Sequence, residues 1–356
     1  MGKFTKTLLI VILVIVLAFG GFLGWLTLTE FNPDPIETLE PIKKDAAVTL
    51  PQGASLSILS WNVGYAGLGA ESDFFMDGGQ NARSADENTV NRYLEGIHAL
   101  TSSGAYDLVL LQEVDTNSAR TYGINEARSL AAGTSYHALN YSCPFVPNPN
   151  TLFYDPIGKV NSGLLTMSNY YVESAERISL PCPFSWPLRI ANLKRCLLVS
   201  YIPIEGTEQS LVLVNLHLEA YDDGEGKLAQ TRQLREFIQS EYQKGNYVIA
   251  GGDFNQVFPG SLERYPNNHP ELWEPGVLEA NMLPEGAGWQ FVCDLATPTC
   301  RLLNQPYDPT DLANTQYYVI DGFIVSPNVI LDSVETLNQG FVNSDHNPVQ
   351  IRVTLR

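Results

Sequence analysis

The chain has 356 residues, of which 44% are hydrophobic and 17% are charged, so it has ample apolar material for a folded core and is not a disordered protein. Its formal charge is −18, and the residues after position 53 carry 17 basic against 34 acidic side chains. Proteins that hold nucleic acid without sequence preference do so mainly with Lys and Arg on the phosphates. The acidic balance therefore argues against a general nucleic-acid-binding protein.

The N-terminus carries the pattern of a membrane-spanning helix. Residues 8–28 contain no charged side chain and are long enough to cross a hydrocarbon core of about 30 Å. Lys3 and Lys6 precede this stretch and acidic residues follow it, which predicts a cytoplasmic N-terminus and an extracytoplasmic domain. A cleaved signal peptide is the alternative, but its apolar core usually runs about 7–15 residues, and Ala18-Phe19-Gly20 is a poor cleavage site. We therefore predict a single-pass anchor in the cell membrane over residues 1–29.

The remaining chain divides into a linker and one catalytic-size domain. Residues 30–53 combine four prolines with acidic side chains, which predicts an extended linker. In residues 54–356, apolar residues recur at helical spacing over 87–102 and 227–243. Short apolar runs predict strands at 56–61, 108–112, 197–202, 211–218, 247–251, 318–325 and 349–355. Buried strands that alternate with helices predict an α/β fold of two packed mixed β-sheets flanked by helices.

Long loops and five cysteines complete the organisation. Three loops rich in Pro, Gly and aromatic residues, at 64–85, 140–156 and 259–288, exceed the length of simple connections, so we expect them to shape a binding site. Cys293 and Cys300 flank a short Pro-containing segment and are candidates for a disulfide outside the cell. The other three cysteines then leave at least one thiol unpaired. Because the sequence has no Cys-x-x-Cys pair, it predicts neither a zinc site nor a thioredoxin-like site.

Six polar motifs lie at or just beyond the ends of apolar strand-like runs. In chain order they are Ser60-Trp61-Asn62, Leu111-Gln112-Glu113, Asn215-Leu216-His217-Leu218, Gly252-Asp253-Phe254-Asn255, Ile320-Asp321-Gly322-Phe323 and Ser344-Asp345-His346-Asn347. Any one of them is explained by a turn or a helix cap. Phosphoester cleavage needs a cation, an activated water and stabilisation of the leaving oxygen. Oxygen ligands such as Asp, Glu and Asn suit Mg²⁺ or Mn²⁺, so the set as a whole predicts this chemistry.

The order of these motifs resembles the endonuclease/exonuclease/phosphatase superfamily, whose members include deoxyribonuclease I, neutral sphingomyelinases and inositol polyphosphate 5-phosphatases. The resemblance covers residues 55–356, and the chain looks like a membrane-anchored bacterial-type member. It implies a four-layer α/β sandwich and a site for Mg²⁺ or Mn²⁺. The residues that it assigns to this metal site are Asn62, Glu113 and Asp345.

The same resemblance implies the catalytic group. Asp253 is expected to activate the attacking water, with Asn255 holding the phosphate or the metal. Asp321 is expected to orient His346, whose protonated ring faces the phosphate.

Two further residues complete the set that the resemblance implies. His217 is expected to act as a general acid or to stabilise the transition state. Asn161, in an Asn-Ser-Gly turn, is expected to contact the substrate near the phosphate.

His217 separates branches of the superfamily. Alternation along residues 211–218 places Asn215 and His217 on one face of the strand and the apolar residues on the other. Deoxyribonuclease I, sphingomyelinases, inositol phosphatases and deadenylases carry a His at this point, whereas abasic-site endonucleases generally do not. The sequence does not place the acidic residue that partners the equivalent His in deoxyribonuclease I, and this weakens a nuclease interpretation.

The sequence therefore predicts a membrane-tethered, metal-dependent phosphoric-ester hydrolase, a phosphodiesterase or phosphatase, that acts outside the membrane as a monomer. Tethering and the acidic composition favour a lipid head group or a small phosphodiester as substrate over long DNA, although nucleic acid stays open. One alternative is an extracellular nuclease like deoxyribonuclease I. The other is a non-catalytic binding domain, but such a domain is expected to have lost ligands, and all the motif residues are in place.

Overall fold

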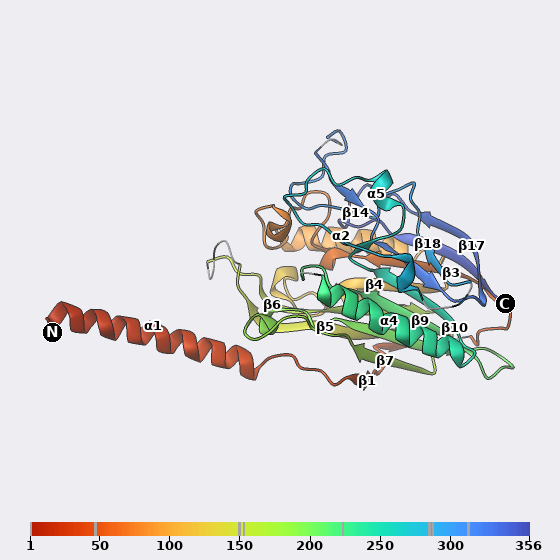
Figure 1. Ribbon diagram of the computed structural model, residues 1–356, viewed down its shortest axis with the longest axis horizontal. Helices are drawn as coiled ribbons and strands as arrows, with labels where there is room; N and C mark the ends of the chain where they lie inside the picture. The colour runs from red at the N-terminus through yellow and green to blue at the C-terminus, as the bar shows by residue number, and fades with distance from the viewer. Residues whose placement is uncertain are drawn as a thin grey trace.

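Two seven-stranded mixed sheets packed face to face form the body of the protein (Figure 1). The computed structural model describes residues 2–45, 48–148, 151, 154–222, 224–283, 286, 288–311 and 314–356. The first sheet has the strand order β17 (Val329–Thr336), β18 (Val349–Leu355), β3 (Ser55–Asn62), β4 (Leu108–Asp115), β6 (Gly158–Ser168), β5 (Thr134–Val146) and β2 (Lys43–Lys44). The second has the order β1 (Ile36–Thr38), β7 (Ser174–Ser179), β8 (Cys196–Pro203), β9 (Ser210–His217), β10 (Tyr247–Asp253), β16 (Asp321–Val325) and β13 (Gln290–Val292).

The strand directions bring the ends of four central strands to one edge of the sandwich. The pairs β3–β4 and β9–β10 are parallel, and the pairs around them in each sheet are antiparallel. Two short two-stranded sheets accompany the sandwich. One pairs β11 (Gln256–Val257) with β12 (Gly276–Val277), and the other pairs β14 (Cys300–Arg301) with β15 (Tyr317–Tyr318). Because parallel strands end on the same side, the polar residues that follow them meet at this edge.

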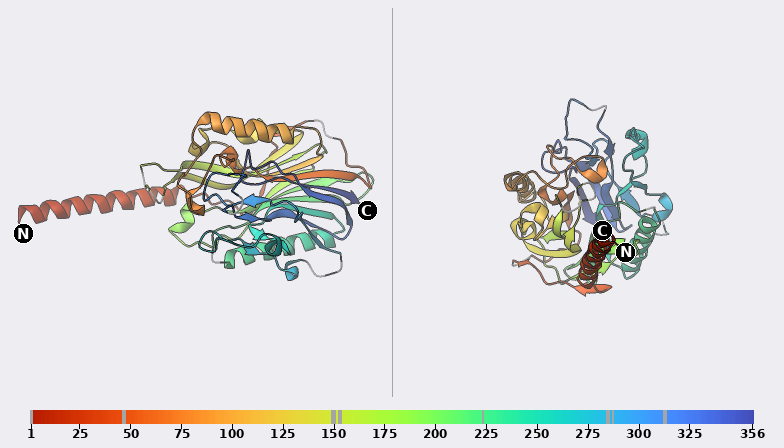
Figure 2. Two further views of the ribbon diagram at one scale, coloured as in Figure 1. Left: turned by 90° about the horizontal axis from the view of Figure 1, so that it is seen from above. Right: turned by 90° about the vertical axis from the view of Figure 1, so that its left-hand side faces the viewer.

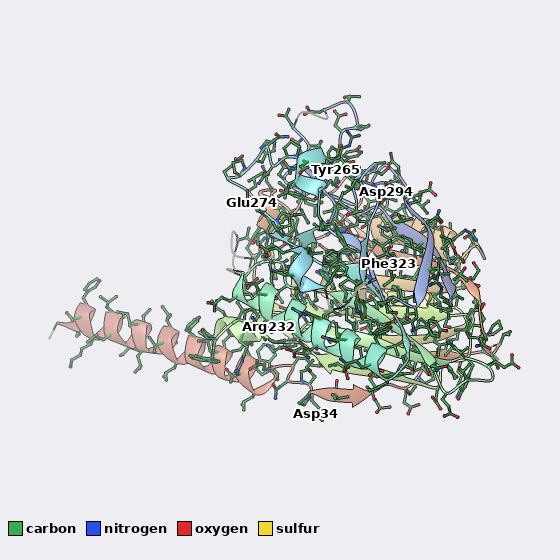
Figure 3. The ribbon with its side chains drawn as sticks, turned by 45° about the vertical axis from the view of Figure 1, so that its right-hand side comes forward. Asp34, Arg232, Tyr265, Glu274, Asp294 and Phe323 are labelled. Atoms are coloured by element: carbon green, nitrogen blue, oxygen red, sulfur yellow. The ribbon has the colours of Figure 1, made fainter. Side chains whose placement is uncertain are left out.

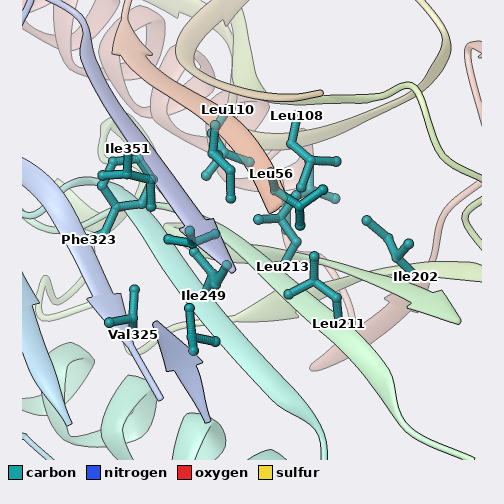
Figure 4. Close-up of a cluster of buried hydrophobic side chains, with 14 of the residues drawn as sticks. Leu56, Leu108, Leu110, Ile202, Leu211, Leu213, Ile249, Phe323, Val325 and Ile351 are labelled. Atoms are coloured by element: carbon teal, nitrogen blue, oxygen red, sulfur yellow. The ribbon is translucent and has the colours of Figure 1, made fainter. Parts of the chain in front are cut away.

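An apolar core between the sheets holds the sandwich together. Leu56, Leu108 and Leu110 of the first sheet face Leu211 and Leu213 of the second, and all five side chains are buried (Figure 4). Full burial of such a side chain stabilises the fold by about 1.5–3 kcal/mol relative to exposure. The alternation of apolar residues along each strand therefore fixes both the register and the pairing of the sheets.

Helices cover the outer faces of both sheets. Tyr93 and Ile97 of α2 (Glu87–Thr101) pack on Trp61 of the first sheet. Leu234 and Ile238 of α4 (Glu225–Gln243) pack on the second sheet. Figure 2 shows α2 and α4 on opposite sides of the two sheets. The expected four-layer sandwich is therefore confirmed, with α3 (Glu126–Leu130) and α5 (Ser261–Arg264) as short additions.

Two expected elements differ from the structure. The strand expected at 318–325 is divided, since β15 ends at Tyr318 and β16 begins at Asp321, and the Thr299 hydroxyl accepts the backbone N–H groups of residues 320 and 321 between them. The loop expected at 140–156 is a strand over its first half, because β5 continues to Val146. Pro144, which favoured a loop, lies in an irregularity of the β5–β6 pairing, where no ladder hydrogen bond is lost. Residues 149–150 and 152–153 of this loop, and 284–285 and 287 of the third, lie outside the described residues.

The cysteines form no disulfide. All five lie within the described residues, and each is a free thiol, including the expected pair Cys293 and Cys300. Cys300 belongs to β14 and forms an isolated bridge with His346, whereas Cys293 follows β13 in the second sheet. Burial raises the pKa of the Cys300 thiol to about 12, so it stays protonated.

Residues 30–53 belong to the domain and are not a separate linker. Ile36 of β1 pairs with β7 in the second sheet, and Lys43 of β2 pairs with β5 in the first. Leu50 is fully buried in the core between the sheets. Figure 3 shows Asp34 beside the start of β1, along the lower border of the second sheet. The apolar side chains between the prolines cause this segment to pack on the domain, because they find partners in the two sheets. Local composition does not reveal these partners.

The N-terminal helix α1 (Lys3–Leu28) projects from one end of the domain (Figure 1). Its 26 residues are long and apolar enough to cross a membrane, and its apolar window is not buried in the protein. This is the property of a membrane anchor and also of a signal sequence near the N-terminus.

Candidate active site

The candidate site lies where β3, β4, β9 and β10 end. Seven residues singled out from the sequence line one pocket, namely Asn62, Glu113, His217, Asp253, Asn255, Asp345 and His346. Sheet register causes this meeting, because Asp253 pairs with His217 across the parallel strands and with Asp321 across the antiparallel ones. Asp321 does not line the pocket but lies behind His346.

His346 is held as a cation facing the pocket. Its Nδ1 lies 2.8 Å from Oδ2 of Asp321, and its backbone carbonyl accepts a hydrogen bond of 2.8 Å from Trp61 Nε1. Burial opposes the charged ring, but the electrostatic attraction of Asp321, with a smaller contribution from Asp345, raises its pKa well above the usual value. The other ring nitrogen, Nε2, lies 3.9 Å from Asp253 Oδ2 and is therefore directed at the site.

His217 has the opposite protonation state to His346. Its Nε2 lies 3.3 Å from Asp253 Oδ2 and 3.9 Å from Glu113 Oε1. Its Nδ1 is buried and has no hydrogen-bond partner among the described residues, so no carboxylate orients it from behind. Burial, the positive charge of Arg195 and that of His346 lower the pKa of His217 well below its usual value. The ring is therefore neutral, and the acidic partner that the sequence did not reveal is absent from the described part of the chain.

Asp253 is fixed between these two rings. Its Oδ1 accepts the Asn255 backbone N–H at 2.8 Å, and its Oδ2 accepts Asn62 Nδ2 at 3.0 Å. Burial and the negative charge of Asp321 raise the pKa of Asp253 to about 7, although His346 opposes the shift. A carboxyl group that titrates near neutrality is suited to taking a proton from water.

The chain around Asp253 accepts backbone strain to keep this geometry. Gly252 has φ +151°, and a Cβ there would lie 1.9 Å from the Leu216 carbonyl oxygen, so only glycine allows β9 and β10 to approach this closely. Asn255 has a left-handed φ of 50°, and its Nδ2 donates to the Leu218 carbonyl oxygen at 2.8 Å. Such strain is concentrated at functional sites, where the surrounding structure over-determines the conformation.

Glu113 and Asp345 form the carboxylate pair of the site. Glu113 has φ +56° and lies where the β4–β6 register shifts, so a bulge turns its side chain toward the pocket. Burial and the neighbouring Glu113 charge raise the pKa of Asp345 to about 6, while His346 opposes the rise. Glu113 and Asp345 line the same pocket, and carboxylate oxygens are the donors that a hard divalent cation such as Mg²⁺ or Mn²⁺ prefers. Cys300, Asp345 and His346 also place one possible ligand atom each within 4.8 Å of one another, so Asp345 belongs to a group that could hold a cation.

Asn62 differs from its expected role. Its Oδ1 accepts the Gly64 backbone N–H at 3.0 Å, and its Nδ2 donates to Glu113 Oε1 at 3.2 Å and to Asp253. The amide nitrogen therefore faces the carboxylates, and this geometry favours a residue that holds Glu113 and Asp253 in place over a metal ligand.

The structure does not bring Asn161 to the site. Its Oδ1 accepts a hydrogen bond of 2.7 Å from the Ser142 hydroxyl, and it does not line the pocket, whereas the adjacent Ser162 does. The Asn-Ser-Gly stretch expected to form a turn lies inside β6, where successive side chains point to opposite faces. The expected substrate contact is therefore not supported at this residue.

Other residues complete the pocket without having been recognised in the sequence. Both amide atoms of Asn140, Nε and Nη1 of Arg195 and the hydroxyl of Tyr65 are buried without hydrogen-bond partners among the described residues. Each unpaired buried polar group costs about 1–3 kcal/mol, so their retention beside a cavity indicates a polar ligand. Tyr65 and Trp273 come from loops that we expected to shape the site. No local signal marks Asn140 or Arg195, which lie in or beside ordinary apolar strands.

Comparison with known proteins agrees with the fold. Among solved structures, the chain is similar to an endonuclease/exonuclease/phosphatase from Beutenbergia cavernae, with a TM-score of 0.55, 17% identity and coverage of 85% of this chain and 72% of that one. A Bacteroides vulgatus protein of the same description gives a TM-score of 0.52 and 15% identity over 85% and 100% of the two chains. A Bacteroides thetaiotaomicron protein gives 0.52 and 14% over 86% and 99%. No curated protein matches the sequence.

These likenesses define the fold as the α/β sandwich of deoxyribonuclease I-like proteins. The sequence also matches the Endonuclease/Exonuclease/phosphatase family over residues 59–346. The chain belongs to this family, whose members are in general metal-dependent hydrolases of phosphoesters.

Proposed function

We propose that the protein is a membrane-tethered phosphodiesterase or phosphatase that acts outside the membrane and uses Mg²⁺ or Mn²⁺. The observation that carries the proposal is the pair of rings around Asp253. The neutral His217 and the cationic His346 have Nε2 atoms 3.3 and 3.9 Å from the same carboxylate oxygen. A space between a carboxylate, a cation and a neutral donor suits the attack of water on a phosphoester.

The proposed roles follow from the protonation states. Asp253, oriented by Asn62 and the Asn255 backbone, accepts a proton from the attacking water. His346, whose ring orientation Asp321 fixes, places its positive charge against the phosphate oxygens. When bound at Glu113 and Asp345, the metal supplies neutralisation of the phosphate charge.

His217 receives a narrower role than the sequence suggested. Because its pKa is lowered well below the usual value, the ring carries no extra proton near neutral pH and is a poor general acid. Its Nε2 is suited to a hydrogen bond that stabilises charge on the phosphoryl group. Arg195 is buried beside it, with Nε 3.9 Å from Glu219 Oε2 and with Nη1 lacking a hydrogen-bond partner among the described residues, so Nη1 offers a further contact to anionic oxygens of the substrate.

Two observations favour a small phosphodiester or a lipid head group over long DNA. The domain is strongly acidic, so a polyanion that tracks its surface meets repulsion outside the pocket. The candidate site also lies in a pocket with Tyr65, Tyr221 and Trp273 in its walls, which encloses one head group.

Hydrolysis of a defined panel tests the proposal. Because residues 30–53 pair with both sheets, the full chain in detergent is used, with Mg²⁺ and with bis-p-nitrophenyl phosphate, p-nitrophenyl phosphate, a phosphodiester lipid, inositol phosphates and plasmid DNA as substrates. Asp253→Asn, which keeps the side-chain shape, is the matched control. We expect metal-dependent turnover of a small or lipid phosphoester that is lost in the control. Cleavage of DNA alone would favour the nuclease alternative, and identical behaviour of wild type and control would favour a binding domain.

A further inference from the structure

We propose that the catalytic end of the domain lies against the membrane, so that its pocket opens at the lipid surface and receives the phosphoester head group of a membrane lipid. This rests on the proposed function and deepens it by naming the substrate class. The contact is made by residues 181–195, which we call the wall segment.

The anchor and the candidate site occupy the same end of the molecule. β18 begins at Val349, three residues after His346, and runs to the C-terminus at the far end. Figure 2 shows α1 leaving the domain at the end opposite the C-terminus. Leu193, which lines the pocket with His346, precedes Lys194, which contacts Glu30 just after α1, so the candidate site lies toward this end. A membrane crossed by α1 faces the pocket and not the back of the sandwich.

The anchor is held firmly against the domain. Glu30, two residues after α1, lies 2.9 Å from Arg189 Nε and 3.1 Å from Lys194 Nζ, and its side chain is 9% exposed. A hydrogen bond of 3.2 Å joins Trp186 Nε1 to the Thr27 hydroxyl. The pairing of β1 with β7 begins only a few residues later. The helix therefore cannot swing freely, and its direction sets the orientation of the domain.

The length of α1 places the wall segment at the lipid interface. At 1.5 Å per residue, 26 residues span about 39 Å, whereas the hydrocarbon core is about 30 Å thick. The uncharged stretch, residues 8–28, matches this thickness once the N-terminal end of α1 with Lys3 and Lys6 lies outside the core, so Leu28 lies near the outer interface. Thr27, which bonds to Trp186, lies at this end of α1, and Phe22, which contacts Phe145, lies deeper. The Phe145 ring packs edge-on against Phe22 at 5.8 Å, and Trp186 bonds to Thr27.

The wall segment has the side chains of an interfacial contact. Trp186 is 55% and Leu188 65% exposed, although both lie beside the end of α1. Trp is enriched where a protein meets the membrane interface, because its ring is apolar and its N–H is polar. Glu30 offsets one of the two positive charges of Arg189 and Lys194, and the domain as a whole is acidic, so apolar insertion is the main source of contact and attraction to anionic lipid is secondary.

The same segment forms a wall of the pocket. Ala191, Asn192 and Leu193 line the cavity that also contains His217 and Asp253. Only a few residues separate this lining from the exposed Trp186 and Leu188. A head group can therefore reach the candidate site while its acyl chains stay in the bilayer.

A depth measurement tests the orientation without reference to activity. An environment-sensitive fluorophore is placed by Leu188→Cys in the full chain, reconstituted in neutral phosphatidylcholine nanodiscs, with unmutated protein as the labelling background. Val48→Cys is the matched control, because Val48 is 69% exposed and bridges to Tyr170, just beyond the end of β6 that lies opposite the site. We expect spin-labelled lipid to quench the probe at 188 and not at 48, with no dependence on salt. Equal access of a water-soluble quencher to both probes overturns the proposal.

A kinetic measurement tests the consequence for the substrate. We expect the double variant Trp186→Ser with Leu188→Ser to lose at least tenfold in kcat/KM on a phosphodiester lipid in vesicles and to stay within twofold on bis-p-nitrophenyl phosphate. Val48→Ser should match wild type on both. Equal losses on both substrates, or none on the lipid, contradict the proposal. If wild type hydrolyses neither a soluble nor a lipid phosphoester, the proposed function fails, while the probe at 188 still decides the orientation.

Discussion

A buried amide pair beneath the pocket gives a prediction that joins stability to activity. Gln112 Nε2 donates to Asn215 Oδ1 at 2.8 Å, and Asn215 Nδ2 donates to the carbonyl oxygens of Leu111 and Leu165, each at 3.1 Å. Both amide side chains are fully buried, and the bonds cross from the second sheet to the first. Gln112 directly precedes Glu113, and Asn215 lies two residues before His217. These hydrogen bonds therefore set the distance between Glu113 and His217.

The perturbation is Asn215→Leu, which keeps the branched shape and removes these three hydrogen bonds and a longer one of 3.4 Å to the Thr166 hydroxyl. At about 0.5–1.5 kcal/mol each, the loss is about 2–6 kcal/mol, partly offset by the apolar side chain. We expect the free energy of unfolding to fall by about 3 kcal/mol, which corresponds to a Tm lower by about 5–10 °C. Turnover should also fall, since the two halves of the site are no longer held in register.

The assay is thermal unfolding of the detergent-solubilised chain, combined with a double-mutant cycle. Gln112→Leu together with Asn215→Leu should be less destabilising than the sum of the single changes by about 1–2 kcal/mol, because no amide is then left unpaired. Asn88→Leu, the same chemical change on the exposed surface of α2, should stay within about 0.5 kcal/mol of wild type. Additive single effects, or a neutral Asn215→Leu, would refute the reasoning.

Three further predictions concern the metal, His217 and the anchor. EDTA should abolish hydrolysis and Mg²⁺ or Mn²⁺ should restore it, whereas recovery with Zn²⁺ alone would contradict an oxygen-ligand site. His217→Ala should lower kcat by about 10²–10³-fold in steady-state assays, the usual loss when one donor that stabilises transition-state charge is removed, and a loss below tenfold would assign the ring a structural role. Burial opposes ionisation of Glu30, but its bonds to Arg189 and Lys194 outweigh this and lower its pKa below 4.5. The contact between Glu30 and its two cations should therefore be complete above pH 4.5 and be lost as the pH falls through the lowered pKa. Its loss should broaden the distribution of distances between spin labels on α1 and on the domain. A distribution that stays unchanged in acid would count against the prediction.

Local patterns were sufficient for the fold and for much of the pocket. Apolar runs such as the one before Asp253 predict buried strands by themselves, and polar residues at the ends of parallel strands must meet at one edge of a sheet. Asn161 shows the limit of this reasoning. Its Asn-Ser-Gly stretch has the composition of a turn, but pairing with β5 makes it part of a strand that directs the side chain toward Ser142.

The sequence by itself determined which chemical groups this protein has, in what order they follow its strands, and that an apolar helix precedes the domain, because all three are properties of neighbouring residues. Only the tertiary structure decided that His217 is neutral and His346 cationic, because their charges depend on Arg195 and Asp321, which are distant in the chain. It also decided that residues 36–38 and 43–44 each join a sheet and that Glu30, just after α1, contacts the segment that lines the pocket. Protonation, strand pairing and orientation depend on long-range contacts, and no local pattern records them.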